Sequence, residues 1–280
     1  MYLTQDLGKA YFTVSKMIKQ VETSGFYDGN VLGNLVILRH GQSTWNESNL
    51  FTGWHDVPLT AKGEAEATAA GVTMAQSGLI FDTSHTSVLT RAVVTQHLAL
   101  SAMGQVWLPV QRSWKLNERH YGALQGLDKK ATSDQHGATQ TQIWRRSFDV
   151  APPPVDRQSP EHPVNDQRYR HVLPSDLPAS ECLGDVVARV IPYFQNEVLP
   201  QLREGKTVLL TAHGNSLRAL VMFLENVSET AISQVNIPTG VPRLFKFQDD
   251  LSVESARYLG DEVAIAAAVE AVAQQATRHP

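Results

Sequence analysis

The sequence predicts an α/β fold, a three-layer sandwich in which a mostly parallel central sheet is flanked by helices. Short runs rich in leucine and β-branched residues, at residues 34–37 and 206–211, alternate along the chain with helical patterns. Each run leads directly into a polar turn that contains glycine, one with His40 and the other with His213. Such turns lie at the carboxyl edge of an open α/β sheet, so we expect the two histidines to face one crevice.

Length and composition are those of an ordinary globular protein. The chain has 280 residues, of which 42% are hydrophobic and 19% charged, enough for one large domain or two small ones. We expect a single domain over residues 34–280, with a C-terminal tail from about residue 261. Residues 1–33 are expected to form an N-terminal extension, helical or partly ordered, with one short helix over residues 11–21; a cleaved presequence is the alternative.

Charge, hydropathy and cysteine content exclude several classes of partner. The formal net charge of -4 offers no general attraction to nucleic acid or anionic membranes, so any positive field must be local. No apolar run approaches the roughly 20 residues that span a bilayer. The single cysteine, Cys182, allows no intrachain disulfide, which fits a reducing compartment. We therefore expect a cytoplasmic protein without nucleic-acid or membrane partners.

The first predicted helix covers residues 61–78. Thr60 is a plausible N-cap, and Glu64 lies in the first turn, where a carboxylate is favourable to the helix dipole. One side of this helix carries Ala65, Ala69, Val72 and Ala75.

Residues 81–100 predict a short strand, a loop and a helix that begins near Leu89. Arg91 then lies in the first turn of that helix, where a guanidinium opposes the helix dipole unless an anion binds there. A solvated surface arginine is the alternative interpretation. A third short strand is expected at residues 105–110.

A polar, glycine-broken segment, residues 114–130, is typical of a functional loop. It places Glu118, Arg119, His120 and Tyr121 next to one another. A helix over residues 139–147 carries the adjacent pair Arg145 and Arg146. Residues 151–178 contain seven prolines and predict a long surface excursion.

The last third of the chain returns to regular elements. A long helix is expected over residues 180–202, with Pro192 as a possible kink and an apolar side formed by Val186, Val187, Val190 and Ile191. A strand is predicted at residues 243–248. The alanine-rich residues 261–280 predict a helix that either lies over the site or frays.

The residue types around His40 match a phosphoryl acceptor. A neutral histidine nitrogen attacks phosphorus while guanidinium groups hold the equatorial oxygens, so Arg39, Arg91 and His213 would surround the same phosphate. Fixed cations supply the electrostatic stabilisation that magnesium gives elsewhere. Such a site needs no metal. The chain has no GxxxxGK[ST], HExxH or CxxC motif, so the sequence gives no support for a nucleotide or zinc site.

Transfer of a phosphoryl group onto histidine expels an alkoxide, which needs a proton from a nearby carboxyl group. Glu118 is the candidate, although a loop salt bridge to Arg119 is a serious alternative. Arg145 and Arg146 are suited to a carboxylate or a second phosphate, and a solvated helix face is the alternative for this pair.

Several long motifs together resemble the 2,3-bisphosphoglycerate-dependent phosphoglycerate mutases of the histidine phosphatase superfamily. The resemblance extends from about Asn34 to the C-terminus. RHG alone is typical of the whole superfamily, whereas LNERHYGALQGL with the arginine pair is specific to the mutase branch. The motifs, in chain order, are RHGQSTWN, FTGW, TSVLTRA, LNERHYGALQGLDK, IWRRSFDVAPPP, AHGNSLRAL and NIPTGVP.

This resemblance implies a role for each site residue. His40 is the residue phosphorylated, Glu118 the proton donor and acceptor, and Arg39, Arg91 and His213 the phosphate pocket. Further positions match residues that contact or orient the substrate: Asn46, Thr52, Gly53, Arg119, Tyr121, Lys129, Arg145, Arg146, Gly214 and Asn215. Gln42, Asp128 and Cys182 depart from the residues usual in the family, and none has a proposed chemical role.

The implied reaction is the interconversion of 3-phosphoglycerate and 2-phosphoglycerate in glycolysis and gluconeogenesis, without a metal. It passes through phosphohistidine, with 2,3-bisphosphoglycerate as primer and intermediate. The resemblance also implies a dimer or tetramer. Two alternatives remain: a phosphatase, in which water dephosphorylates His40, and a catalytically silent protein that senses phosphorylated metabolites.

Overall fold

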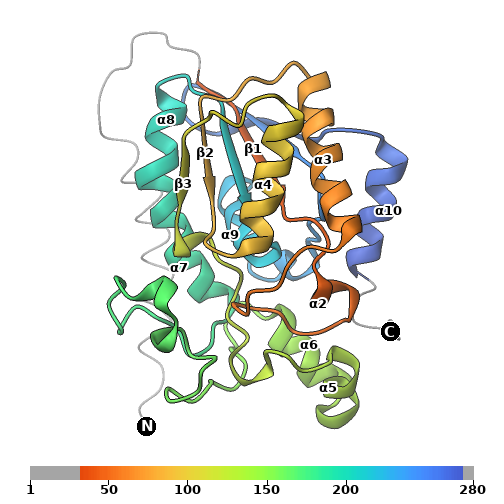
Figure 1. The fold of residues 1–280 in the computed structure, drawn as a ribbon, viewed down its shortest axis with the longest axis vertical. Coiled ribbons are helices and arrows are strands. Elements are labelled where there is room, and N and C mark those ends of the chain that lie inside the picture. Colours follow the sequence, from red (N-terminus) through yellow and green to blue (C-terminus); the bar gives the residue numbers. More distant parts are fainter. Residues whose placement is uncertain (1–31, 274–280) are drawn as a thin grey trace. The chain divides into compact units, whose positions relative to one another are not determined.

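A six-stranded sheet organises residues 32–273, the part of the chain that the computed structural model describes (Figure 1). The strand order is β3-β2-β4-β1-β5-β6. The first four strands in this order are parallel, and β5 and β6 pair in antiparallel fashion, so the predicted mostly parallel sheet is confirmed. The strands are β1 (Leu35–Arg39), β2 (Thr83–Thr86), β3 (Val110–Arg112), β4 (Val208–Ala212), β5 (Arg243–Phe247) and β6 (Val253–Tyr258).

Helices cover both faces of the sheet, as predicted. Figure 1 shows α3 (Ala61–Gln76) and α4 (Thr90–Ala102) in front of it and α9 (Gly214–Leu224) behind. Strand β1 is buried on both sides: Val36 and Leu38 belong to the core under α3 and α4, whereas Leu35 and Ile37 pack in the core with α7 (Leu183–Tyr193) and α9. A strand enclosed in this way is continuously apolar rather than alternating.

The pairing of β1 with β4 brings the two histidine turns together. Arg39, the last residue of β1, lies opposite Ala212, the last residue of β4. The His40 amide donates to the Ala212 carbonyl at 3.0 Å, which extends the pairing by one residue. His40 and His213 therefore leave neighbouring parallel strands at the same level, and the predicted common edge is confirmed.

Two further helices, α5 (Lys129–His136) and α6 (Ala138–Arg146), lie near this edge. Figure 1 places α5 and α6 below the carboxyl edge of the parallel strands. None of the described helices is long and apolar enough to cross a membrane. The other α-helices of the described residues are α2 (Thr44–Glu47), α8 (Leu199–Arg203) and α10 (Glu262–Ala273).

Helix α3 begins after its predicted N-cap, Thr60, whose side chain accepts from the Gly63 amide. The side formed by Ala65, Ala69, Val72 and Ala75 is nevertheless exposed. The buried side is Gly63, Ala67, Ala70, Gly71 and Met74. A Cβ at Gly71 would lie 2.2 Å from the Ala99 carbonyl of α4, so close helix packing selects the side with glycines.

One strand prediction needs correction, and one strand was missed. The third strand covers Val110–Arg112 rather than residues 105–110, because the Gln105 side chain bonds the Phe81 amide and residues 105–108 turn. Strand β6 was not predicted, since an edge strand with the polar sequence VESARY has no apolar run.

The long helix expected over residues 180–202 begins at Leu183 and is interrupted by a π-helical turn, Phe194–Val198, before α8. Pro192 and Pro200 flank this turn, and neither can donate a helical hydrogen bond. The proline-rich excursion, residues 151–178, contains only short 3₁₀ turns, at Pro163–Asn165 and Gln167–Tyr169. The helix predicted over residues 11–21 lies outside the described residues, and the domain boundary at 33/34 stays a prediction.

Candidate active site

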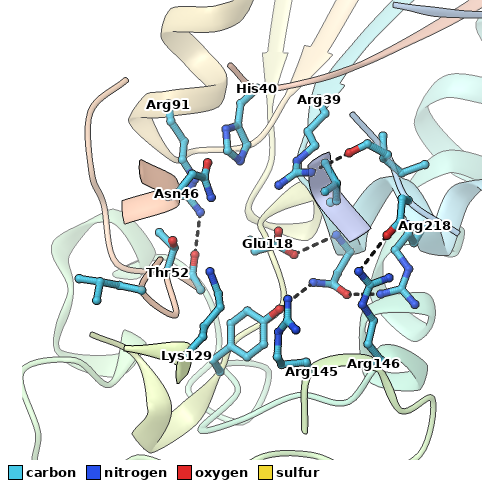
Figure 2. A pocket seen from close by; sticks show the side chains of 18 of the residues that line it. Arg39, His40, Asn46, Thr52, Arg91, Glu118, Lys129, Arg145, Arg146 and Arg218 are labelled. Atoms are coloured by element: carbon cyan, nitrogen blue, oxygen red, sulfur yellow. Dashed lines mark hydrogen bonds between the residues drawn. The ribbon is translucent and has the colours of Figure 1, made fainter. Parts of the chain in front are cut away.

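A pocket opens at the carboxyl edge of β1 and β4, with about 680 Å³ of empty space (Figure 2). Six of its lining side chains are arginine or lysine, and a single one, Glu118, is a carboxylate, in a chain whose net charge is -4. The local positive field that the sequence analysis expected therefore lies in this pocket. The lining residues are Arg39, His40, Asn46, Leu50, Thr52, Gly53, Arg91, Glu118, Tyr121, Lys129, Arg145, Arg146, Gly214, Asn215, Arg218, Val235, Asn236, Ile237 and Val272.

His40 is held with one ring nitrogen free. Its Nδ1 lies 2.7 Å from the Gly41 carbonyl, which can only accept, so the proton is on Nδ1 and Nε2 keeps its lone pair. Burial, followed by the charges of Arg91 and Arg39, lowers the pKa of His40 well below its usual value. The ring is thus neutral and nucleophilic at neutral pH. Gly41 must lack a side chain, because a Cβ would lie 2.1 Å from the Gly63 carbonyl.

His213 lies beside it, with 5.0 Å between the ring centroids. This second ring is fully buried and does not line the pocket itself. Its Nε2 is 2.7 Å from the Ser87 hydroxyl. Burial, with Arg91 and His40, lowers the pKa of His213 well below its usual value, so it too is neutral without a bound anion.

Two buried arginines flank the histidines. Arg91 lies in the first turn of α4, as predicted, and its guanidinium donates to the carbonyls of Gly53 and His55 at 2.7 and 3.0 Å. Burial lowers its pKa to about 10, which leaves it charged at neutral pH.

Arg39 donates to the Ile237 carbonyl at 2.6 Å, and its buried Nε has no partner among the described residues. Carbonyls hold both guanidinium groups without neutralising them, which suits an anion.

The Glu118 carboxylate lies between the two ends of the pocket. Its Oε1 accepts from the Arg119 amide at 2.8 Å and from the Asn215 amide, in the first turn of α9, at 3.0 Å. The alternative of a salt bridge to Arg119 is wrong, because that guanidinium donates instead to the carbonyls of Trp144 and Arg145. Arg119 is fully buried and lies under the Tyr121 ring, 4.7 Å from its centroid, so it supports the pocket without lining it.

A second group of cations lies opposite His40 and Arg91 in Figure 2. Burial, with the charges of Arg145 and Arg39, lowers the pKa of Lys129 to about 7. Arg145 is also buried, so the alternative of a solvated face is wrong for it. Arg146 is partly held by the Ser233 carbonyl at 3.0 Å and by the Asn236 side chain at 2.8 Å.

Tyr121 joins the same side of the pocket. Burial alone would raise its pKa, but the charges of Arg119 and Arg145 outweigh burial and lower it. Its hydroxyl accepts from the Asn215 side-chain amide at 3.2 Å, which links the loop of residues 114–130 to α9.

The structure also adds residues that the sequence analysis did not single out. Arg218 lines the pocket, donates to the Asn215 side chain at 3.0 Å, and has its pKa lowered to about 9, chiefly by burial. The signal was present, since Arg218 is three residues after Asn215 and so on the same side of a helix. Val272 of α10 also lines the pocket, so of the two alternatives for the C-terminal residues, a helix over the site or a fraying end, the first holds at this position.

The smaller predicted residues lie where expected. Asn46, Thr52, Gly53, Gly214 and Asn215 all line the pocket. Gly53 has a positive φ of 53°, and a Cβ there would meet the Gln125 side chain at 2.1 Å. No group of three or more His, Cys, Asp or Glu side chains able to hold a metal is found among the described residues.

Comparison with known proteins assigns the family. A sequence profile of the histidine phosphatase superfamily (branch 1) matches residues 35–165. The 2,3-bisphosphoglycerate-dependent phosphoglycerate mutase of Xylella fastidiosa (strain M12) is 54% identical over 241 residues, which cover 86% of this chain and 97% of the relative. The chain belongs to the 2,3-bisphosphoglycerate-dependent phosphoglycerate mutases. The resemblance of its motifs to this mutase family is thereby confirmed.

Solved structures share the fold of this mutase at lower identity. A phosphoglycerate mutase from Bacillus anthracis has a TM-score of 0.58 and 21% identity, with coverage of 84% of this chain and 96% of that one. An alpha-ribazole phosphatase from Shigella flexneri has a TM-score of 0.60 and 21% identity, covering 81% and 96%. The fold is therefore common to mutases and phosphatases, and the function of this mutase has to be argued from its pocket.

Proposed function

We propose that this pocket interconverts 3-phosphoglycerate and 2-phosphoglycerate through a phosphorylated His40. One observation carries the proposal: a neutral ring nitrogen, His40 Nε2, is directed to a pocket that has buried cations at two ends. A single phosphate needs only the end near Arg39 and Arg91. Cations at the far end suit a substrate that has a carboxylate as well as a phosphate.

In the proposed reaction, His40 Nε2 attacks the phosphorus of a phosphate held by Arg39 and Arg91. These guanidinium groups stabilise the negative charge on the equatorial oxygens of the phosphoryl group. His213 stabilises the same oxygens, either by donating a hydrogen bond or as a protonated ring. The bond between phosphorus and the substrate oxygen breaks, and the phosphoryl group moves to Nε2. Phosphorylated His40 then gives the group to the free hydroxyl of 3-phosphoglycerate, which forms 2,3-bisphosphoglycerate. After this intermediate reorients, Nε2 takes its other phosphate and 2-phosphoglycerate is released.

Glu118 provides the proton in this scheme. Two backbone amides hold Oε1, which leaves Oε2 to serve the leaving oxygen. Glu118 protonates the oxygen as it departs and takes the proton back from the attacking hydroxyl in the reverse transfer. Glu118 Oε2 lies next to the first turn of α9, 3.6 Å from where a Cβ of Gly214 would lie, which is an ordinary van der Waals contact.

The charges of the pocket fit 2,3-bisphosphoglycerate, the primer that the family requires. The unpartnered Nε of Arg39 and the cluster of Lys129, Arg145 and Arg218 provide more positive charge than one phosphate can neutralise. When bound, this compound supplies the phosphoryl group that loads His40. Arg39 and Arg91 would hold the phosphate that reacts, and Lys129 and Arg145 the anionic groups at the far end.

We also propose that copies of this chain associate through the side of the sheet where β3 is the edge strand. Exposed apolar side chains gather around the start of β3: Ile80 is 71% exposed, Trp107 68% and Val106 56%. The contacts of Gln105 with the Leu79 carbonyl and the Phe81 amide hold these two loops together. An unpaired edge strand beside apolar side chains favours pairing with another copy.

A cytoplasmic location and independence from metals stay predictions.

The deciding experiment is conversion of 3-phosphoglycerate to 2-phosphoglycerate, read by adding enolase after the mutase step. The step is run with and without catalytic 2,3-bisphosphoglycerate and with excess chelator. We expect strong turnover that depends on the primer and is insensitive to the chelator. Release of phosphate without isomerisation would favour the phosphatase, and absence of both would favour the sensing protein.

A further inference from the structure

A buried ion pair lies behind Glu118 and takes no part in the proposed chemistry. Arg189 of α7 is 8% exposed and Glu181, just before that helix, is 3% exposed. Arg189 Nε donates to Glu181 Oε1 at 2.6 Å and a terminal nitrogen donates to Oε2 at 2.9 Å, so the pair is bidentate. We call these two residues the Arg189–Glu181 clamp. Neither lines the pocket.

Every N–H of the Arg189 guanidinium is used. Besides the two bonds to Glu181, it donates to the carbonyls of Lys115, Asn117 and Glu118 at 2.8, 3.0 and 2.9 Å. Five donors, the whole inventory of the group, therefore converge on one carboxylate and one short stretch of backbone.

Glu181 binds the backbone on the C-terminal side of Glu118, at His120. Its Oε2 accepts from the His120 amide at 2.8 Å, and its own amide donates to the His120 carbonyl at 2.9 Å. The Glu118 carbonyl also accepts from the Trp54 indole. The backbone is thus held at Asn117, Glu118 and His120 by residues that come from other parts of the sequence.

A buried ion pair is a poor device for stability alone, because well-packed apolar residues of similar size often serve as well or better. The bonds of this pair are concentrated on the loop that carries Glu118. Such a distribution is suited to placing a side chain accurately, since a misplacement of about 1 Å can cost as much as 100-fold in rate.

We propose that Arg189 and Glu181 are positioning residues for Glu118. They hold the peptide groups of residues 117–120 so that the Glu118 carboxylate reaches the leaving oxygen while Oε1 keeps its bonds from the Arg119 and Asn215 amides. This inference rests on the proposed function, in which Glu118 is the acid. It assigns no contact with substrate to the clamp.

The test is a double-mutant cycle on the rate at which radioactive 2,3-bisphosphoglycerate labels His40, measured in single turnover with the whole chain. Arg189→Lys keeps the charge but cannot form the five bonds, so labelling should slow about 10- to 100-fold. Glu118→Gln removes the acid. Adding Arg189→Lys to Glu118→Gln should then cause no further loss, because the positioned group no longer donates a proton.

Two further variants separate positioning from general damage. Arg189→Met with Glu181→Leu removes both charges together, which avoids leaving one buried charge alone, and should label as slowly as Arg189→Lys. Arg243→Lys is the matched control. Arg243 pairs with Glu225, with 2.5 Å between nitrogen and oxygen, and neither residue lines the pocket. Its replacement should leave the labelling rate unchanged. The thermal midpoint is recorded for every variant.

The outcomes are distinct. A loss in Arg189→Lys that disappears in the Glu118→Gln background supports the positioning role. Losses that multiply in the double variant, or a loss no larger than that of Arg243→Lys, overturn it while leaving the proposed function intact. If the unaltered enzyme itself gives no label on His40, the proposed function fails, and the clamp inference fails with it.

Discussion

The pocket has two walls that differ in origin and in chemistry. One wall lies at the sheet edge and is carried by β1, β4 and the first turn of α4. It is formed by Arg39, His40 and Arg91, with His213 behind them. The opposite wall, with Lys129 and Arg145 among its cations, belongs to α5 and α6, which follow a glycine-broken loop. Glu118 lies between them.

The difference in construction matches a difference in task. At the sheet edge, hydrogen bonds to neighbouring strands fix the backbone, and the two histidines are neutral because burial lowers the pKa of each. That wall is suited to reaction. The opposite wall presents cations on short helices, and these are suited to recognition of the far end of the substrate. Substitutions in the sheet-edge wall should therefore lower kcat, and substitutions in the opposite wall should raise KM. Variants of each wall can test this contrast.

The largest effect is expected from His40→Ala. Loss of the nucleophile should reduce kcat by roughly 10⁴-fold or more and abolish the acid-labile label from 2,3-bisphosphoglycerate. The enolase-coupled rate and acid-quenched labelling measure these, with the thermal midpoint as control for folding. A label that persists in this variant would assign the nucleophile to another residue.

His213→Ala should slow labelling of His40 by roughly 100- to 1,000-fold, because a group that stabilises the charge of the transferring phosphoryl is lost. The label should still form at long times, and KM should stay within about 3-fold. Single-turnover labelling and steady-state kinetics separate the two quantities. An increase in KM alone would move His213 to the recognition wall and break the contrast.

On the opposite wall, Arg145→Ala should raise the KM for 3-phosphoglycerate by roughly 10- to 100-fold, with kcat within about 3-fold, since a charge-assisted hydrogen bond to substrate is lost. Arg112→Ala, on exposed β3, is the control and should change neither constant. A fall in kcat with unchanged KM would contradict the recognition role.

Lys129 makes the same wall sensitive to pH. Its pKa is about 7, so the ammonium is present below pH 7 and is lost as the pH rises above it. We expect kcat/KM to fall roughly 10-fold between pH 7 and 8.5, and Lys129→Arg to remove most of that fall because a guanidinium stays charged. Profiles of kcat/KM from pH 6 to 9 measure this. Superimposable profiles would exclude Lys129 as the titrating group.

The smallest effect concerns stability at the sheet-edge wall. The folded-state pKa of His213 is lowered well below 6.5, whereas the unfolded chain protonates this residue near 6.5. The unfolded state therefore binds more protons below pH 6.5, and the free energy of unfolding should fall there by up to about 1.4 kcal/mol per pH unit for this histidine.

Urea unfolding from pH 7 to 5 tests this sign. His213→Asn should show a shallower fall than the unaltered chain, and Arg112→Ala, which changes no group that titrates between pH 5 and 7, should leave the slope in this window unchanged. Equal slopes in the unaltered chain and His213→Asn would contradict the argument that burial keeps His213 neutral.

Much of the sheet-edge wall could be predicted from the sequence because its signals are local. An apolar run followed by a histidine turn indicates both the strand and its carboxyl end, and parallel pairing then brings His40 and His213 together. The α3 surface was predicted poorly because alanine is so frequent there that spacing does not discriminate. Its packing against α4 through Gly71 depends on a neighbour that is distant in sequence.

The sequence by itself determined the layered α/β class, the strand-end histidines and, through long motifs, the mutase family. Only the tertiary structure decided that Arg145 is buried in the pocket, that Arg218 and Val272 line it and that the Arg189–Glu181 clamp holds the Glu118 loop. The reason is physical: hydrogen-bonded strands express a local pattern, whereas burial and the pairing of charges depend on residues that folding brings from far along the chain.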